Sequence, residues 1–254
     1  MKRTVIIAVL TLCVTAQIHS QEIRDSIVSA ADSAYIQGDF ITAASLYERI
    51  IANGGVNATV YMNLGNCRYH QDEIAKAIIC YERAYLLDPS DEDVKFNLEL
   101  ARTKTVDKVT PKNRMFPVVW FESVRSCLDV RHWTVTVIVM FALTFLTLGL
   151  LLFSRKYYVR KISLGFALFF FVFSILSFIF ASTQMGSISD RDTAIVMIPS
   201  VTVKSTPIES GTDLFTIHEG RKVEIIDAGM KEWVEIRLED GNTGWLPQSA
   251  IEII

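Results

Sequence analysis

The sequence is poor in the residues and motifs from which catalytic and metal sites are built. It has 4 histidines, and His19, His70, His132 and His218 fall in separate segments without the spacing of metal ligands. It also lacks a phosphate-binding glycine loop, a nucleophile elbow and a pair of carboxylates in a catalytic arrangement. These absences argue against an enzyme, and we expect no metal and no cofactor.

Charge is absent from two long apolar runs. Residues 133–153 and 162–183 contain no Asp, Glu, Lys, Arg or His, which argues against an ion or proton path through them. Each run is long enough to cross a bilayer, because about 21 residues extend over about 31 Å as a helix. Two helices of a soluble core are the alternative. We favour two transmembrane helices, since a soluble helix keeps a polar face and neither run shows one.

A short basic segment separates the two runs and predicts their orientation. Residues 154–161 carry basic side chains, two tyrosines and no acidic residue. Short basic loops stay in the cytoplasm, and tyrosine favours the headgroup level. The flanking segments are therefore expected on the periplasmic side of the inner membrane. Arg114, Arg125 and Arg131 lie before the first span and oppose this orientation.

A third apolar run opens the chain. Lys2-Arg3 precede it, and the run from Val5 to Ala16 is too short to span a bilayer. A basic start followed by a short apolar stretch and small residues is typical of a cleaved secretory signal. We assign residues 1–20 to a signal peptide, with an uncleaved signal anchor as the alternative.

The clearest positive feature is an internal repeat with a period of about 34 residues. Tyr47-Glu48-Arg49 recurs as Tyr81-Glu82-Arg83, and Asn63-Leu64 recurs as Asn97-Leu98. This period is typical of a helix–turn–helix unit that stacks on its neighbours. Residues 21–110 hold about two and a half such units, the last being a single helix that caps the stack.

The second repeat carries the pattern of a known family at seven positions, namely Tyr61, Leu64, Gly65, Ala77, Tyr81, Ala84 and Pro89. In this respect the region resembles tetratricopeptide repeat (TPR) proteins. The resemblance implies an all-α solenoid that binds a peptide or protein in the concave groove of its first helices. Met62, Asn66 and Tyr69 are the residues expected to face that groove. Alternatively, Met62 and Tyr69 only pack against the flanking repeats. Because Met62 stands where a carboxylate clamp has lysine, we do not expect recognition of a C-terminal carboxylate.

The cysteines of the repeat region allow two interpretations of their role. Three remain after removal of the signal, and Cys67 and Cys80 would lie on the two helices of one repeat. They could form a disulfide in an oxidising exterior, or they could be small buried hydrophobic residues.

Residues 111–132 are expected to link the repeats to the first span. This segment places its apolar residues on one helical face, namely Trp120, Phe121, Val124 and Leu128. An amphipathic helix of this kind suits the membrane interface. A linker that packs on protein is the alternative.

Residues 190–254 change to short alternating runs that end in turns. The runs begin near Ile195, Val201, Phe215, Val223, Trp233 and Gly244, and Asp240-Gly241 predicts a tight turn before the last of them. They outline a small all-β barrel, whose His218-Glu219-Gly220 and Gly244-Trp245-Leu246 strings resemble bacterial SH3 domains. Trp233 and Trp245 are expected to fill its core.

The composition of the same segment limits its partners. No tyrosine follows Tyr158, which argues against the proline-rich ligands of eukaryotic SH3 domains. The segment has 6 basic and 12 acidic residues, a net charge of −6, so nucleic acid is a poor partner. Peptidoglycan is the ligand that these observations leave open for this segment.

The order of segments has its own resemblance. A signal peptide, TPR repeats, two spans joined by a basic loop and an SH3-like unit that includes Leu214 to Gly220 resemble the BatE family of aerotolerance-operon proteins. The resemblance implies a membrane complex with von Willebrand A-domain proteins and a MoxR-type ATPase, with a role in oxidative or envelope stress. We therefore expect a multidomain membrane protein that acts as a non-enzymatic scaffold. A protein that anchors to or senses the cell wall through its SH3-like unit is the alternative.

Overall fold

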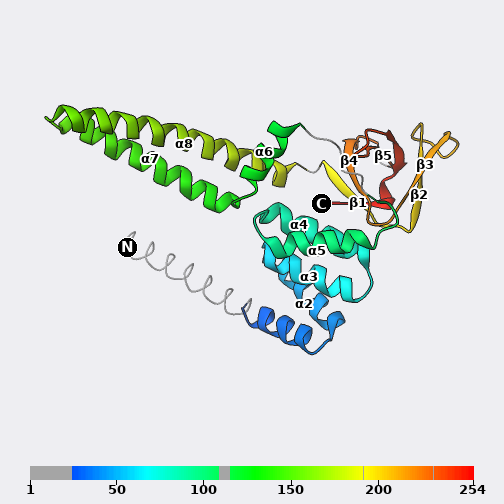
Figure 1. The fold of residues 1–254 in the computed structure, drawn as a ribbon. Coiled ribbons are helices and arrows are strands. Elements are labelled where there is room, and N and C mark those ends of the chain that lie inside the picture. The colour runs from blue at the N-terminus through cyan, green and yellow to red at the C-terminus, as the bar shows by residue number, and fades with distance from the viewer. Residues whose placement is uncertain (1–24, 109–114, 191, 231) are drawn as a thin grey trace, which may run out of the picture.

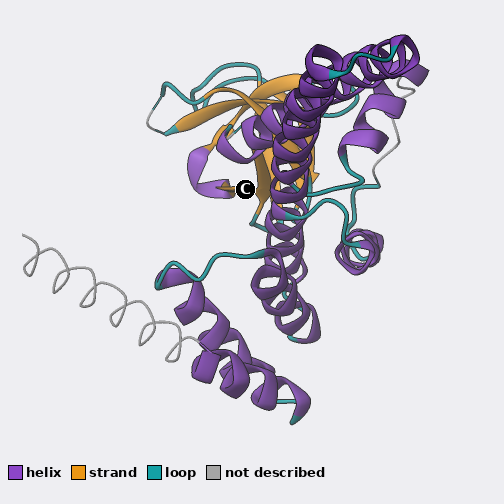
Figure 2. Cartoon of the chain, turned by 90° about the vertical axis from the view of Figure 1, so that its left-hand side faces the viewer, coloured by secondary structure: helices purple, strands orange, loops and turns teal. Residues whose placement is uncertain are grey.

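A computed structural model of the chain describes residues 25–108, 115–190, 192–230 and 232–254. It has three parts: a stack of helices, a long helical hairpin and a β-sheet (Figure 1). The hairpin projects away from the other two parts, which lie side by side (Figures 1 and 2). The predicted signal peptide and residues 111–114 of the predicted linker lie outside the described residues.

The helical stack, called the repeat unit below, covers residues 25–108. A helical segment over residues 25–36 is followed by α2 (Phe40–Ala52), α3 (Ala58–His70), α4 (Ile74–Leu87) and α5 (Glu92–Thr103). The helix ends repeat with the sequence. Asn57 and Asp91 cap α3 and α5 in the same way, since their side chains accept from the backbone N–H groups of Val60 and Val94.

A close approach of α3 and α4 explains the small residues of the repeat. A Cβ atom on Gly65 would lie 2.6 Å from the ring of Tyr81. Tyr81 and Ala77 are fully buried at this contact. The repeat pattern therefore encodes helix packing, with glycine on one helix making room for tyrosine on the next.

The hairpin consists of α7 (Val130–Phe153) and α8 (Tyr157–Ser189), which are both long and apolar enough to cross a membrane. Only residues 154–156 of the predicted loop at 154–161 are not helical. Because Tyr157 to Lys161 contains neither proline nor glycine, nothing interrupts the helix there.

The hairpin buries several small and polar side chains and exposes most of its bulky apolar ones. The buried residues of α8 include Ser163, Ser174, Ser177 and Gln184, and the hydroxyl of Ser174 donates to the carbonyl of Val137 on α7 at 3.3 Å. The bulky phenylalanine and leucine side chains of both helices are mostly exposed. The expectation of no polar face was therefore wrong for α8, because Ser163, Ala167, Ser174 and Ser177, spaced by four, seven and three residues, lie on its buried side.

The strands of residues 193–253 form one antiparallel sheet, called the sheet unit below. Its strands are β1 (Thr193–Val196), β2 (Ser200–Lys204), β3 (Asp213–His218), β4 (Lys222–Asp227), β5 (Trp233–Arg237), β6 (Thr243–Pro247) and β7 (Ile251–Ile253). They are ordered β3-β2-β6-β5-β4-β1-β7, so the hydrogen-bonded sheet is open, with β3 and β7 at its edges. The short 3₁₀ helix η1 (Gln248–Ala250) leads into β7, a strand that the sequence analysis missed.

The two tryptophans of the sheet unit do not fill its core. Val234, Ile236 and Leu246 are buried there, and side chains alternate between the faces of a strand. Trp233 and Trp245 therefore lie on the opposite face, where both are half-buried. The prediction that they fill the core was wrong, because β-branched and leucine side chains already occupy the inner positions.

Candidate functional site

The first helices of the repeats expose an apolar surface. Met62 and Tyr69 on α3 are partly buried and pack against the core of the repeat unit. On α5, Phe96 is 67% exposed and Leu100 is 38% exposed. Phe96 stands 34 positions after Met62, so the two occupy equivalent places in successive repeats. We call Met62, Tyr69, Phe96 and Leu100 the first-helix face.

Asn66 has a structural role instead. Its side-chain oxygen accepts from the hydroxyl of Tyr81 at 2.8 Å and from the amide of Asn97 at 3.1 Å, so it joins α3, α4 and α5. The preceding repeat uses equivalent residues with one difference: Tyr47 donates to Asp32 at 2.5 Å, and the amide of Asn63 donates to the Tyr47 hydroxyl at 3.3 Å. This polar ladder fixes the stacking of the repeats, and it occupies the one oxygen that Asn66 would offer a partner.

The ring of Tyr69 contacts the cationic side chain of Lys104. The ammonium of Lys104 lies 4.3 Å from the ring centroid of Tyr69, a geometry that favours a cation–π contact. Lys104 follows α5, so this contact ties the end of the stack to α3. The first-helix face is thus apolar on α5 and carries a positive charge beside Tyr69.

Phe96, Leu100 and Lys104 were missed by the sequence analysis, although the sequence contained the signal. The period of 34 residues carries Met62 to Phe96, Asn66 to Leu100 and His70 to Lys104. Applying this offset to the candidates Met62 and Asn66 would have found Phe96 and Leu100. Lys104 corresponds to His70, which was not a candidate, so the offset alone would not have found it.

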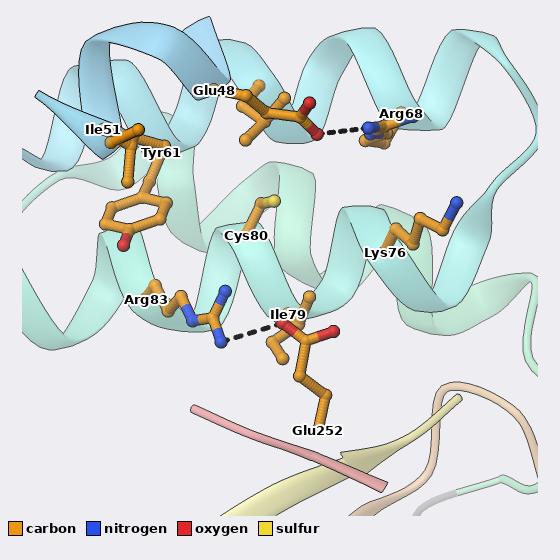
Figure 3. A pocket seen from close by; sticks show the side chains of 11 residues that line it. Glu48, Ile51, Tyr61, Arg68, Lys76, Ile79, Cys80, Arg83 and Glu252 are labelled. Atoms are coloured by element: carbon orange, nitrogen blue, oxygen red, sulfur yellow. Dashed lines mark hydrogen bonds and ion pairs between the residues drawn. The ribbon is translucent and has the colours of Figure 1, made fainter. Parts of the chain in front are cut away.

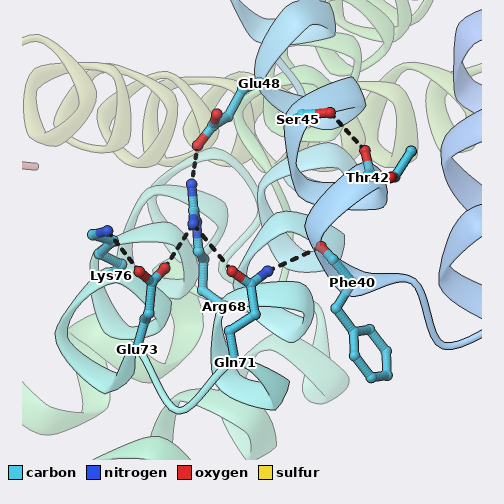
Figure 4. A network of polar contacts seen from close by, with 8 residues as sticks. All are labelled: Phe40, Thr42, Ser45, Glu48, Arg68, Gln71, Glu73 and Lys76. Carbon is cyan, nitrogen blue, oxygen red and sulfur yellow. Dashed lines mark hydrogen bonds and ion pairs between the residues drawn. The ribbon is translucent and has the colours of Figure 1, made fainter.

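A polar network holds the second helices to the first on the other side of the stack. The guanidinium of Arg68 contacts Glu48 on α2 and lies 2.6 Å from Glu73, the residue before α4 (Figure 4). Gln71 continues the network by donating to the carbonyl of Phe40 at 2.9 Å. These contacts immobilise the side chains that a ligand would need, so we assign the network to stability.

A pocket of about 280 Å³ opens beside this network, between the repeats and β7 (Figure 3). Arg83 and Cys80 line it, and Arg83 donates to Glu252 at 2.9 Å. Every cation at the pocket is engaged: Arg68 and Lys76 contact Glu73, and Arg83 contacts Glu252. The pocket is therefore a gap at the contact between the repeats and β7, and we do not assign it a ligand.

Cys67 and Cys80 are free thiols that both lie in the buried core of the repeat unit. Burial raises the pKa of Cys67 to about 11 and the pKa of Cys80 to about 12. A neutral thiol is a poor nucleophile and a poor metal ligand. The structure thus corresponds to the second of the two interpretations, in which these cysteines are small core residues.

The raised pKa values predict selective alkylation. At pH 8 the thiols of Cys67 and Cys80 stay protonated, since their pKa values lie about three units or more above that pH. Iodoacetamide should therefore modify the exposed Cys127 and spare the other two in the folded full-length protein. Peptide mass spectrometry without reduction measures this. Modification of Cys80 as fast as Cys127, or a peptide linking Cys67 to Cys80, would contradict the structure.

The sheet unit docks on α4 through its first strand. Ile195 on β1 is fully buried in the same cluster as Ile78 and Ile79 on α4. Its neighbours Ala194 and Val196 belong to the core of the sheet. Strand β1 is thus covered on both faces, by the sheet core on one and by the repeat unit on the other.

A buried carboxylate completes the contact. The side chain of Glu82 on α4 is only 2% exposed and lies 2.6 Å from Arg102 on α5 and 2.7 Å from Lys222 on β4. After α5, Asp107 accepts from the backbone N–H of His218 at 2.7 Å and contacts its ring Nδ1 at 2.9 Å. These contacts join the repeat unit to the sheet unit.

The sheet unit has a pocket of its own, of about 340 Å³, on the face that carries Trp233. Trp233 and Pro247 give it an apolar wall, and Glu209 and Glu232 add carboxylates. An aromatic ring beside carboxylates suits a cationic or amino-bearing group. Within the described residues, no three His, Cys, Asp or Glu side chains are grouped to hold a metal ion.

Comparison with known proteins identifies the repeat. The tetratricopeptide repeat family matches residues 58–91, which run from the start of α3 to the residue before α5. Among solved structures, the Arabidopsis OM64 TPR domain is similar at 18% identity with a TM-score of 0.31, over 56% of this chain and 91% of that domain. A search of the curated proteins finds no match.

Proposed function

We propose that the chain is a membrane-anchored, non-enzymatic scaffold that binds protein partners through its repeat unit. The observation that carries this proposal is the TPR match at residues 58–91, next to an exposed apolar surface on α5. TPR stacks generally bind proteins, and large exposed apolar side chains gathered on one face are typical of an interaction surface. The docked sheet unit adds a second surface at a fixed position.

The hairpin supports anchoring in a bilayer. Phe145, Phe166 and Leu168 are more than half exposed, whereas Ser163 and Ser177 are buried. Water would penalise this distribution, because it leaves apolar area exposed and buries hydroxyls. Lipid favours it, since small and polar residues let transmembrane helices approach while bulky apolar side chains meet the acyl chains. We therefore assign α7 and α8 to two spans.

The basic turn supports the orientation. Arg155, Lys156, Arg160 and Lys161 lie at the closed end of the hairpin, far from the repeat and sheet units (Figure 1). Short basic connections stay in the cytoplasm. This orientation puts the repeat unit and the SH3-like sheet unit in the periplasm. Together with the BatE-like order of segments, it leads us to propose a Bat-type complex with von Willebrand A-domain proteins and a MoxR-type ATPase.

Co-purification tests the scaffold. The tagged, full-length protein is extracted gently from its native membrane, and the proteins that accompany it are quantified by mass spectrometry. We expect stoichiometric membrane proteins with the native chain and at least a tenfold loss with Phe96→Ala plus Tyr69→Ala, if the two side chains together contribute about 1.4 kcal/mol or more. Ile41→Ala is the matched control, because Ile41 is as exposed as Phe96 but lies on α2. Partners that remain with the double variant would contradict the proposal.

The pocket beside Trp233 favours the cell wall as the second candidate partner. Its carboxylates and aromatic wall suit the amino groups of a peptidoglycan peptide. Under this alternative, the full-length protein in detergent sediments with purified wall at low salt, and Trp233→Ala with Glu232→Ala abolishes sedimentation. A native protein that stays in the supernatant would rule the alternative out.

A further inference from the structure

The helix before the first span has an exposed apolar flank that the scaffold function does not use. This helix, α6 (Phe116–Arg125), buries no residue completely. Phe116 is 80% exposed and Trp120, one turn later, is 57% exposed. The preceding Met115 is also exposed. Large aromatic side chains that are exposed together on one flank indicate a surface that another molecule or the membrane covers.

The opposite side of α6 is fixed to the end of the hairpin. Phe121 packs on Phe180 of α8 at 5.2 Å between ring centroids, and Trp133 of α7 packs on the same ring at 4.9 Å. The indole of Trp133 donates to the carbonyl of Arg125 at 3.0 Å. The sequence analysis placed Trp120 and Phe121 on one face, but their surroundings differ: Phe121 packs on Phe180 of the hairpin, whereas Trp120 is 57% exposed.

These contacts set the height of α6 relative to the bilayer. Phe180 stands three residues before the end of the apolar run at Thr183, or about 5 Å along a helix. Trp133 is the first residue of the other apolar run. The helix α6 therefore lies against the hairpin at the level where both apolar runs end, on the side away from the basic turn (Figure 1).

The polar groups of α6 surround that flank: Arg125 lies on the hairpin side, and Ser123 follows Trp120 by one turn on the same side of the helix. Arg125 donates to the hydroxyl of Ser187 at 3.3 Å, beyond the end of the apolar run. Ser123 and Glu122 line an open pocket toward the repeat unit, opposite Lys95 and Tyr85. The helix therefore has the hairpin on one side, a polar pocket toward the repeats on another, and the apolar flank of Phe116 and Trp120 between them.

We propose that this flank lies in the membrane, with Phe116 and Trp120 at the boundary between headgroups and acyl chains of the outer leaflet. The inference rests on the proposed membrane anchoring. Aromatic side chains favour that boundary, and the flank continues the lipid-facing surface of the hairpin. α6 is then a second attachment that stops the repeat unit from swinging about the spans.

Collision of nitroxide labels with lipid-soluble oxygen and with a water-soluble nickel complex tests this inference. The full-length Cys127→Ser protein in phosphatidylcholine nanodiscs is labelled at Phe116→Cys, and Trp120 stays in place. We expect the ratio of oxygen to nickel collision rates to be several-fold higher at position 116 than at Phe96→Cys, an exposed aromatic position on α5 away from the hairpin. A ratio equal to that of position 96 would place the flank in water, and low rates with both quenchers would place it against protein. Either result overturns the inference.

A third label separates this inference from the anchoring on which it rests. Phe145→Cys lies on the exposed side of α7, near the middle of the predicted span. High oxygen collision at position 145 without it at position 116 would overturn only the role of α6. High nickel collision at position 145 would refute the membrane hairpin itself.

Discussion

Replacing Glu82 with alanine is expected to lower the free energy of unfolding by about 2–3 kcal/mol. The change leaves Arg102 and Lys222 without the buried carboxylate that lies between them. Removal of one partner from a fully buried pair costs about 3–5 kcal/mol, and the two cations remain roughly one-third exposed, so solvent offsets part of the loss. Urea unfolding of the full-length protein in detergent, followed by tryptophan fluorescence, measures the change.

The repeat supplies the matched control. Glu48 stands 34 positions before Glu82 and contacts Arg68 in the same way, but its side chain is 50% exposed and no sheet covers it. Glu48→Ala should therefore cost less than about 1 kcal/mol. Equal losses for the two variants would show that the sheet unit does not bury Glu82.

Gly220→Ala is the second change with a large expected effect. Gly220 has φ of +79°, and a Cβ there would lie 2.7 Å from Thr105 and 3.0 Å from Ile78, both in the repeat unit. The variant combines backbone strain of about 1–2 kcal/mol with overpacking of about 1–3 kcal/mol. We expect a total loss of about 2–5 kcal/mol and faster hydrogen exchange along β1 and β4, measured by mass spectrometry.

Gly241→Ala isolates the contribution of backbone strain. Gly241 has φ of +95° in the β5–β6 turn, and a Cβ there meets no atom within 4 Å. The Gly241→Ala variant should lose no more than about 1–2 kcal/mol of stability, and hydrogen exchange along β1 should not change. If both glycine variants lose the same stability, the contact between the repeat and sheet units contributes nothing.

Periodicity explains which parts of the fold could be predicted. The 34-residue repeat placed the helices of the repeat unit, and alternation placed six of the seven strands. The alternation of Trp233, Val234, Glu235 and Ile236 also contained the correct face for Trp233, since Val234 and Ile236 must share the other face. The error came from letting the size of an aromatic side chain outweigh its position.

The contact between the units could not be predicted in this way. Glu48 and Glu82 have identical neighbours in sequence, and a local pattern treats them alike. Their environments differ because Lys222, 140 positions after Glu82, contacts Glu82 and not Glu48. Likewise, the flank of α6 depends on which side of the helix Phe180 covers, and only the tertiary structure decides that.

We predict that the repeat and sheet units form one rigid platform on the hairpin. The distance distribution between spin labels at Ser45→Cys on α2 and Asp240→Cys in the β5–β6 turn tests it most directly, since both positions are exposed. The measurement uses the full-length Cys127→Ser protein in nanodiscs. We predict one narrow distance that Gly220→Ala broadens and Gly241→Ala leaves unchanged. A broad distribution in the unaltered protein would mean that the two units move independently and that no rigid platform exists.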